Sequence, residues 1–99
     1  MFNNGHLGLV RQQQELFYGG RFVASRFDAR PDFAAIARGF GIRACTVRMP
    51  HDEDVLAGAL SEKGPVLLDI EVTEAENVYP MVPLGKSNID AIWAQEVKA

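Results

Sequence analysis

Residues 65–72 read PVLLDIEV, and this stretch decides the fold class. Its apolar residues follow one another, whereas a strand with one face in water alternates apolar and polar residues. A continuous apolar run of this length is typical of a parallel strand that is buried on both faces. We therefore predict a buried parallel strand, in which Asp69 is a hydrogen-bonded structural carboxylate and not a catalytic one.

The residues before this strand complete a strand–helix–strand unit. Residues 42–47 contain Ile, Thr and Val, which favours a strand. Pro50 begins a turn, and Asp52 is a candidate N-cap for a helix that is closed by Lys63 and Gly64. The apolar residues of this helix are Val55, Leu56, Ala59 and Leu60. The spacing predicts a right-handed βαβ unit with parallel strands.

Two further helices are predicted before that unit. Residues 9–18 form the first, and Gly19 and Gly20 end it. Residues 21–30 lack periodicity and are expected to form a connecting loop. Pro31 suits the first position of the second helix, which stops at Gly41. The residues that share one face are Leu9, Gln13, Leu16 and Phe17 in the first helix, and Phe33, Ile36, Ala37 and Phe40 in the second.

The two ends of the chain extend this pattern. Met1 and Phe2 have the character of the last residues of a third strand, so we expect the chain to be the end of a larger α/β domain. Residues 1–87 are assigned to that domain, and residues 88–99 to a C-terminal tail or short helix. Ile89, Ile92 and Trp93 would give such a helix an apolar stripe. The predicted order is helix, helix, strand, helix, strand, with a short parallel sheet.

Composition excludes several classes of partner. The 99 residues suit one small domain, with 47% hydrophobic and 23% charged residues. A net charge of -3 and a pI near 5.3 argue against a general attraction to nucleic acid or to an anionic membrane. No apolar run approaches the roughly 18 residues that span a bilayer, and no export leader is visible. The single cysteine, Cys45, indicates a reducing, cytoplasmic setting.

The loop NNGHLG at residues 3–8 is the candidate site. In an open α/β sheet, ligands lie beyond the carboxyl ends of strands, where a loop enters the next helix. The side chain of Asn4 and the backbone carbonyl of His6 could offer the oxygen ligands that Mg²⁺ prefers. Gly5 and Gly8 would let the backbone approach an anion at the positive end of the helix. The alternative is a plain turn followed by a helix cap.

Four segments carry a resemblance to a known family. FNNGHLGLVRQQQELFYGGRF, PDFAAIARGFGI, GPVLLDIEV and ENVYPMVPLGK together resemble the C-terminal end of the catalytic subunit of acetolactate synthase (acetohydroxyacid synthase). The match runs from Asn3 to about Lys86. The fold implied is part of a Rossmann-like thiamine-diphosphate-binding domain. Other thiamine-diphosphate ligases, such as glyoxylate carboligase, share the fold and the asparagine loop and remain an alternative.

The resemblance implies a cofactor and a reaction. The family uses thiamine diphosphate and Mg²⁺ to decarboxylate pyruvate and to join the two-carbon unit to a second 2-ketoacid, in branched-chain amino-acid synthesis. By resemblance, Asn4 would be a side-chain ligand of Mg²⁺ and His6 a backbone-carbonyl ligand. The remaining cofactor-binding positions are Gly5 and Gly8 in the diphosphate loop, Leu9 beside the cofactor rings, where the family usually has methionine, and Val10 in the same cavity.

Gln13 departs from the family, which generally has tryptophan at this position in the substrate channel where herbicides lodge. Glutamine removes a flat wall from that channel, so the resemblance leaves ketoacid preference and herbicide binding open. The alternative is drift at a helix surface. The segment from Tyr79 to Pro83 is near the same channel in the family, and a packing clamp for the C-terminus is the alternative there.

The resemblance also implies what this chain lacks. In the family, a Gly-Asp-Gly segment upstream supplies another metal ligand, a neighbouring subunit supplies the glutamate that activates thiamine, and a middle domain holds FAD. We therefore expect a fragment that carries part of the site, is inactive alone, and works in a homo-oligomer or with the missing domains of the same enzyme. The alternative is a non-catalytic remnant that serves as a folding or protein-interaction module.

A second polar cluster, His51 to Asp54, could suggest a metal or acid–base site. Acidic residues in the first turn of a helix complement the helix dipole, and this structural role is the preferred interpretation.

Overall fold

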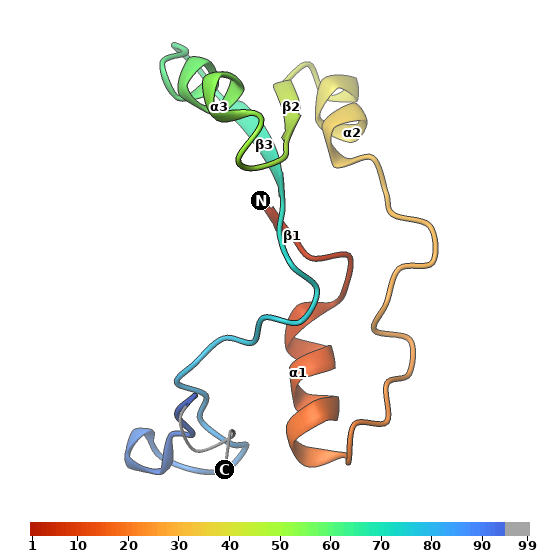
Figure 1. The fold of residues 1–99 in the computed structure, drawn as a ribbon, viewed down its shortest axis with the longest axis vertical. Helices are drawn as coiled ribbons and strands as arrows, with labels where there is room; N and C mark the ends of the chain where they lie inside the picture. Colours follow the sequence, from red (N-terminus) through yellow and green to blue (C-terminus); the bar gives the residue numbers. More distant parts are fainter. Residues whose placement is uncertain (95–99) are drawn as a thin grey trace.

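The computed structural model describes residues 1–94. Within these residues the chain is α/β, with three α-helices, a 3₁₀ turn and a three-stranded parallel sheet (Figure 1). The predicted fold class is therefore confirmed, and so is the order of the predicted elements. Among the described helices, none is both long and apolar enough to cross a membrane.

The sheet is built around the stretch PVLLDIEV. Strand β3 (Val66–Glu71) lies between β1 (Phe2–Asn3) and β2 (Arg43–Val47), and both neighbours run parallel to it. Phe2 pairs with Ile70, and Arg43 pairs with Val66. The expected third strand is present at Phe2–Asn3, where it pairs in parallel with β3, while the prediction that these residues end a longer strand stays a prediction.

Helix α3 (Glu53–Leu60) connects β2 to β3, and its ends differ from the prediction. Asp52 occupies the N-cap position, but its carboxylate makes no cap bond and accepts from the backbone N–H of Arg48 over 2.7 Å. The helix ends at the C-cap Ser61, so the prediction that Lys63 and Gly64 close it is wrong. The helix stops earlier because Ser61 satisfies its last turn, with Oγ donating to the Gly58 carbonyl over 2.8 Å.

Helix α2 (Phe33–Gly39) begins with a side-chain cap. The Asp32 carboxylate accepts from the backbone N–H of Ala35 over 2.8 Å, which makes Asp32 the N-cap. Pro31 precedes the cap, so its predicted place inside the helix is wrong. The predicted apolar stripe is also shifted: α2 buries Ala34 and Ala37, whereas Phe40 is 81% exposed.

The hydrophobic core is small. Its fully buried apolar residues are Ala34, Ala37 and Val47. The prediction that β3 is buried on both faces is wrong for the described residues, because the apolar side chains of β3 are only half-buried. The radius of gyration is 16.8 Å, against about 13 Å for a compact domain of this length. The chain therefore leaves much apolar surface uncovered.

Helix α1 (Gly8–Phe17) lies apart from α2 and α3, beyond the carboxyl ends of the strands (Figure 1). We call residues 18–32 the connecting segment; residues 21–30 form a loop, as predicted, and the segment runs beside α1 back to α2 (Figure 1). The side chain of Arg11 lies 4.8 Å from the centroid of the Phe22 ring, which pins this segment to the helix.

The C-terminal part of the chain passes α1 on its other side (Figure 1). Up to residue 94 it contains one 3₁₀ turn, η1 (Asn88–Asp90), and Ile92 pairs with Met81 in an antiparallel bridge. Of the two alternatives predicted for residues 88–99, a tail or a short helix, the helix through Ile92 and Trp93 is wrong, because Ile92 is held in an extended pairing. Residues 95–99 of the predicted tail lie outside the described residues, and the division at residue 88 stays a prediction.

Candidate functional site

The NNGHLG loop, residues 3–8, joins the carboxyl end of β1 to the first turn of α1. This is the edge of a parallel sheet at which ligands bind in open α/β folds. The connecting segment covers the loop from one side, since His6 forms an antiparallel bridge with Arg26. The backbone N–H of Phe27 donates to the carbonyl of Gly5 over 3.0 Å. The loop is therefore held in place by backbone pairing as well as by its own side chains.

A buried polar pair lies at the base of the loop. Asn3 and Asp69 are 6% and 5% exposed, and the Asn3 Nδ2 group donates to Asp69 Oδ2 over 3.3 Å. Asn3 Oδ1 in turn accepts from the backbone N–H of Gly5 over 3.1 Å. Because the carboxylate accepts hydrogen bonds, it orients the Asn3 amide so that the amide oxygen faces Gly5. Asp69 is a hydrogen-bonded structural carboxylate, as predicted, while the sequence analysis missed the part played by Asn3.

Asn4 makes the second turn in the loop. Its Oδ1 accepts from the backbone N–H of His6 over 3.1 Å, and the His6 ring Nδ1 lies 3.0 Å from the Asn4 carbonyl oxygen. The turn that is the alternative to a ligand site is thus present. The turn occupies one lone pair of Asn4 Oδ1. An amide oxygen has two lone pairs, so one remains for a cation. The role of Asn4 and His6 as metal ligands stays a prediction.

Side chains of other residues approach the two glycines of the loop closely. Gly5 has a φ of +71°, and a Cβ atom there would lie 2.9 Å from Nε of Arg30. A Cβ atom at Gly8 would lie 3.0 Å from the Nδ2 of Asn4. The guanidinium of Arg30 also donates to Glu74 over 2.8 Å, which ties the residues after β3 to the loop. A cationic group therefore lies directly against the backbone of the predicted diphosphate loop.

The first turn of α1 is open to an anion. Leu7 is the N-cap residue and makes no side-chain cap bond, and the first turn holds no acidic residue. Free backbone N–H groups and the helix dipole both favour negative charge at such an end. Leu9 and Val10, the positions predicted beside the cofactor rings, are 62% and 43% exposed. An apolar surface thus lies next to the anion-favouring end of the helix.

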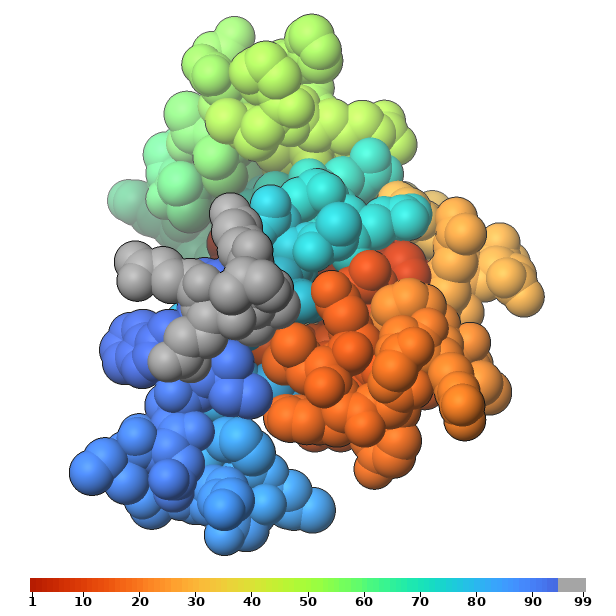
Figure 2. Space-filling model, turned by 60° about the horizontal axis from the view of Figure 1, so that its bottom comes forward, coloured from red at the N-terminus to blue at the C-terminus, as the bar shows by residue number. Residues whose placement is uncertain are grey.

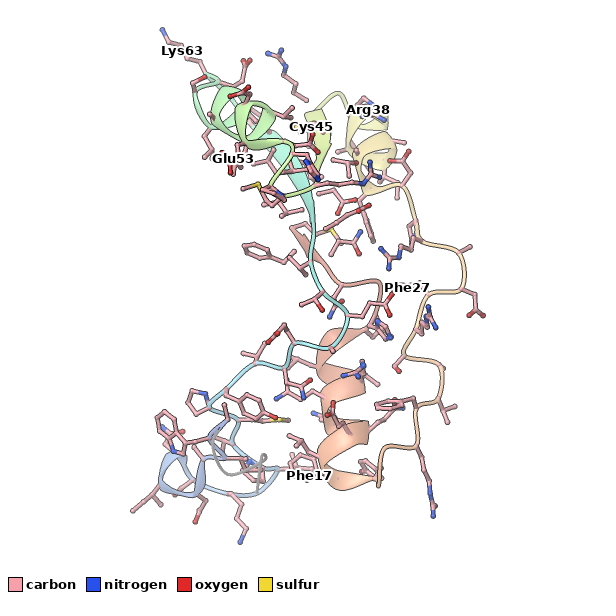
Figure 3. The ribbon with its side chains drawn as sticks, viewed as in Figure 1. Phe17, Phe27, Arg38, Cys45, Glu53 and Lys63 are labelled. Carbon is pink, nitrogen blue, oxygen red and sulfur yellow. The ribbon has the colours of Figure 1, made fainter. Side chains whose placement is uncertain are left out.

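Gln13 lines a hollow of about 470 Å³ between α1 and the C-terminal part of the chain. Figure 2 shows these two parts side by side, α1 in orange and the C-terminal part in blue. Figure 3 places Phe17 at the end of α1, on the side of this hollow. The remaining lining residues are Tyr18, Met81, Val82, Pro83 and Leu84. The structure therefore brings Gln13 together with the segment near Tyr79–Pro83, as the predicted channel requires.

Gln12 and Gln14 were missed by the sequence analysis, which singled out only Gln13. Each side chain forms hydrogen bonds with the backbone of a neighbouring segment. Gln12 bonds to Val78, and Gln14 bonds to Val23. The run of three glutamines held a signal that could have found them. Three consecutive helical residues span about 200° of the helix surface, so they cannot all face solvent on a helix with neighbours on two sides.

The His51–Asp54 cluster shows no sign of a metal centre. Among residues 1–94, no group of three or more His, Cys, Asp or Glu side chains is arranged to hold a metal ion. The bond from Arg48 to the Asp52 carboxylate and the place of Glu53 and Asp54 in the first turn of α3 fit the structural interpretation.

Comparison with protein families defines the class to which this fold and loop belong. Residues 1–70 match the family described as "Thiamine pyrophosphate enzyme, C-terminal TPP binding domain". The chain belongs to this family. Thiamine pyrophosphate is thiamine diphosphate, and a helix end without a side-chain cap or an acidic first turn is compatible with its diphosphate group.

Within that family, the chain is similar to acetolactate synthase large subunits, which confirms the resemblance found in the sequence. It is 47% and 48% identical to those of Pyropia yezoensis and Porphyra purpurea, over 93% of this chain and 16% of each relative. It is 37% identical to the isozyme 1 large subunit of Escherichia coli (strain K12), over 93% of this chain and 16% of the relative. The chain thus spans about 16% of the length of these relatives.

Proposed function

We propose that this chain works as the C-terminal part of the thiamine-diphosphate-binding domain of an acetolactate synthase catalytic subunit. The observation that carries the proposal is the NNGHLG loop, which places the Asn4 amide, a left-handed Gly5 and an uncapped helix end within six residues at the carboxyl edge of the sheet. These are the groups that a magnesium–diphosphate ligand needs: hard oxygen ligands, close backbone approach and N–H donors.

In this proposal each residue of the loop has a defined role. Asn4 Oδ1 and the His6 backbone carbonyl would bind Mg²⁺, while Gly5 and Gly8 admit the diphosphate. Leu9 and Val10 would lie against the apolar rings of the cofactor, and Gln13 would line the path of the 2-ketoacid. Bound thiamine diphosphate supplies the chemistry that decarboxylates pyruvate and joins the two-carbon unit to a second 2-ketoacid in branched-chain amino-acid synthesis.

The proposal assigns the rest of the enzyme to residues outside this chain. A further metal ligand, the glutamate that activates thiamine and the FAD-binding domain would come from other parts of the same enzyme or from a neighbouring subunit. Phe2, Phe40 and Leu84 are 76%, 81% and 102% exposed, which supports a need for further protein surface over the sheet and the tail. The chain alone is therefore expected to form no acetolactate, and the assembled enzyme is expected in the cytoplasm.

A graft tests this proposal. The region of the Escherichia coli isozyme 1 large subunit that this chain matches would be replaced by the corresponding residues of this chain. We expect the hybrid to form acetolactate with thiamine diphosphate and Mg²⁺, and the same hybrid carrying Asn4→Ala to lose most of that activity. A folded, correctly assembled hybrid that makes no acetolactate would contradict the proposal and favour the non-catalytic module.

A further inference from the structure

We propose that Gln12 is a positioning residue for residues 81–84, which form the wall of the hollow opposite Gln13. By holding Val78 and Met81 near α1, it fixes the position of that wall. The inference rests on the proposed function only for the identity of the ligand, a 2-ketoacid. The positioning itself follows from contacts within residues 12–92 and can be tested without any ligand.

Gln12 is the most completely buried side chain of α1, at 1% exposed. Its Nε2 donates to the Val78 carbonyl over 2.7 Å, and its Oε1 accepts from the Val78 backbone N–H over 2.9 Å. The amide therefore pairs with both backbone groups of one residue, as a neighbouring strand would. A buried amide that lost these partners would be left unsatisfied, so the contact fixes the distance between α1 and residue 78.

The same side chain reaches the start of the hollow's wall. Gln12 Nε2 also donates to the sulfur of Met81 over 3.1 Å. Met81 is in turn paired with Ile92 through two backbone bonds of 2.9 and 2.8 Å. Residues 81–84 face Gln13 and Phe17 across the hollow, so a shift of Val78 and Met81 away from α1 would widen it.

Gln14 provides an internal comparison. Its Nε2 donates to the Val23 carbonyl over 2.8 Å, and its Oε1 accepts from the Val23 backbone N–H over 3.3 Å. It makes the same pair of bonds as Gln12, but to the connecting segment on the other side of the helix. Val23 does not line the hollow. Gln14 is therefore a matched control, because its loss should loosen a neighbouring segment and leave the wall in place.

The experiment uses the full 99-residue chain and NMR hydrogen exchange of backbone amides. In Gln12→Met, which keeps the side-chain volume, we expect the Val78 N–H to exchange at least about tenfold faster. We also expect the distances from Gln13 and Phe17 to Met81 across the hollow, measured by NMR, to increase. In Gln14→Met, the Val23 N–H should exchange faster, while Val78 and the wall stay as in the parent chain.

Gln12→Glu adds a pH readout and covers the case in which the methionine variant fails to fold. A charged carboxylate can accept from the Val78 N–H but cannot donate to the Val78 carbonyl, whereas a protonated carboxyl does both. The protection factor of Val78 should therefore rise as the pH falls through the pKa of the new carboxyl. Unchanged Val78 protection in Gln12→Met, unchanged distances from Gln13 and Phe17 to Met81 in that variant, or a Gln12→Glu protection factor that does not depend on pH would each overturn the proposal.

Pyruvate and 2-ketobutyrate, titrated as probes into the same samples, separate this inference from the proposed function. Shifts at Gln13, Phe17 and Met81 that weaken several-fold in Gln12→Met, and not in Gln14→Met, would support both. Absence of any shift in the parent chain would count against the hollow as a 2-ketoacid path, while the Val78 exchange still decides the role of Gln12.

Discussion

The side chain of Asn3 on β1 donates to the carboxylate of Asp69 on β3 over 3.3 Å, and both residues are almost completely buried. This contact joins the first strand to the central strand. It also orients the Asn3 amide so that its oxygen accepts from the Gly5 N–H. The second carboxylate oxygen, Asp69 Oδ1, is buried with no hydrogen-bond partner among the described residues, so the pair leaves little tolerance for another negative charge.

Asn3→Asp is expected to lower the free energy of unfolding by about 1–3 kcal/mol near neutral pH. The substitution removes the amide donor and places a second carboxylate against Asp69, and buried like charges disfavour each other. Lowering the pH should recover part of the loss as one carboxyl takes up a proton. Chemical denaturation at two pH values would measure this. Asn88→Asp, which adds the same charge at an exposed position, is the control; equal losses in the two variants would contradict the account.

Gly5→Ala is expected to cost more stability than Gly19→Ala. Both glycines have a left-handed backbone, with φ of +71° and +63°, which costs a residue with a Cβ about 1–2 kcal/mol. Only Gly5 has a neighbour to displace, the Arg30 guanidinium, because nothing lies within 4 Å of a Cβ at Gly19. The excess loss in Gly5→Ala, measured by thermal unfolding, should shrink when Arg30→Ala is added. An excess that persists in the double variant would show that Arg30 is not the cause.

The ion pair between Arg48 and Glu71 predicts a pH dependence at the carboxyl end of the sheet. Arg48 Nε and Nη2 donate to Glu71 over 2.9 and 3.2 Å. The hydrogen bond from Arg48 lowers the pKa of Glu71 below its ordinary value of 4.5, against the opposing effect of desolvation. A lowered pKa means that the pair stabilises the fold above pH 4.5 and that this contribution is lost as the pH falls through the lower, folded-state pKa.

Glu71→Gln should therefore reduce the unfolding temperature slightly at pH 6 and have less effect near pH 3. The effect should be small and should fade in high salt, because the pair is exposed to solvent. Unfolding temperatures of the parent and the variant, measured at both pH values and at two salt concentrations, would check this. A difference between the two proteins that grows as the pH falls would have the wrong sign.

Much of the fold could be predicted from the sequence because it depends on local patterns. The continuous apolar run of PVLLDIEV identified the central parallel strand, and the glycine pair after Tyr18 identified the end of α1. The degree of burial could not be predicted in the same way. A continuous apolar run predicts burial on both faces in a complete domain, whereas within residues 1–94 the elements around β3 are β1, β2 and two short helices.

The candidate site was predictable in position but not in its supporting contacts. The NNGHLG loop has a recognisable composition, and the structure places it at the edge of the sheet that the prediction requires. The hydrogen bond from Gln12 to Val78 joins residues 66 positions apart. The close approach of Arg30 to Gly5 joins residues 25 positions apart. Such long-range polar contacts follow from tertiary packing. The sequence around one partner does not indicate which distant residue it will contact.

The most direct test of the central claim is paramagnetic relaxation by Mn²⁺, used in place of Mg²⁺, in the presence of thiamine diphosphate. Even weak binding by the 99-residue chain would broaden the NMR signals of nearby amides. We predict broadening at residues 4–10 that requires thiamine diphosphate and is abolished by Asn4→Ala. Broadening confined to the acidic cluster at residues 51–54, or broadening at residues 4–10 that survives Asn4→Ala, would contradict the claim that the Asn4 amide holds a divalent ion against a diphosphate.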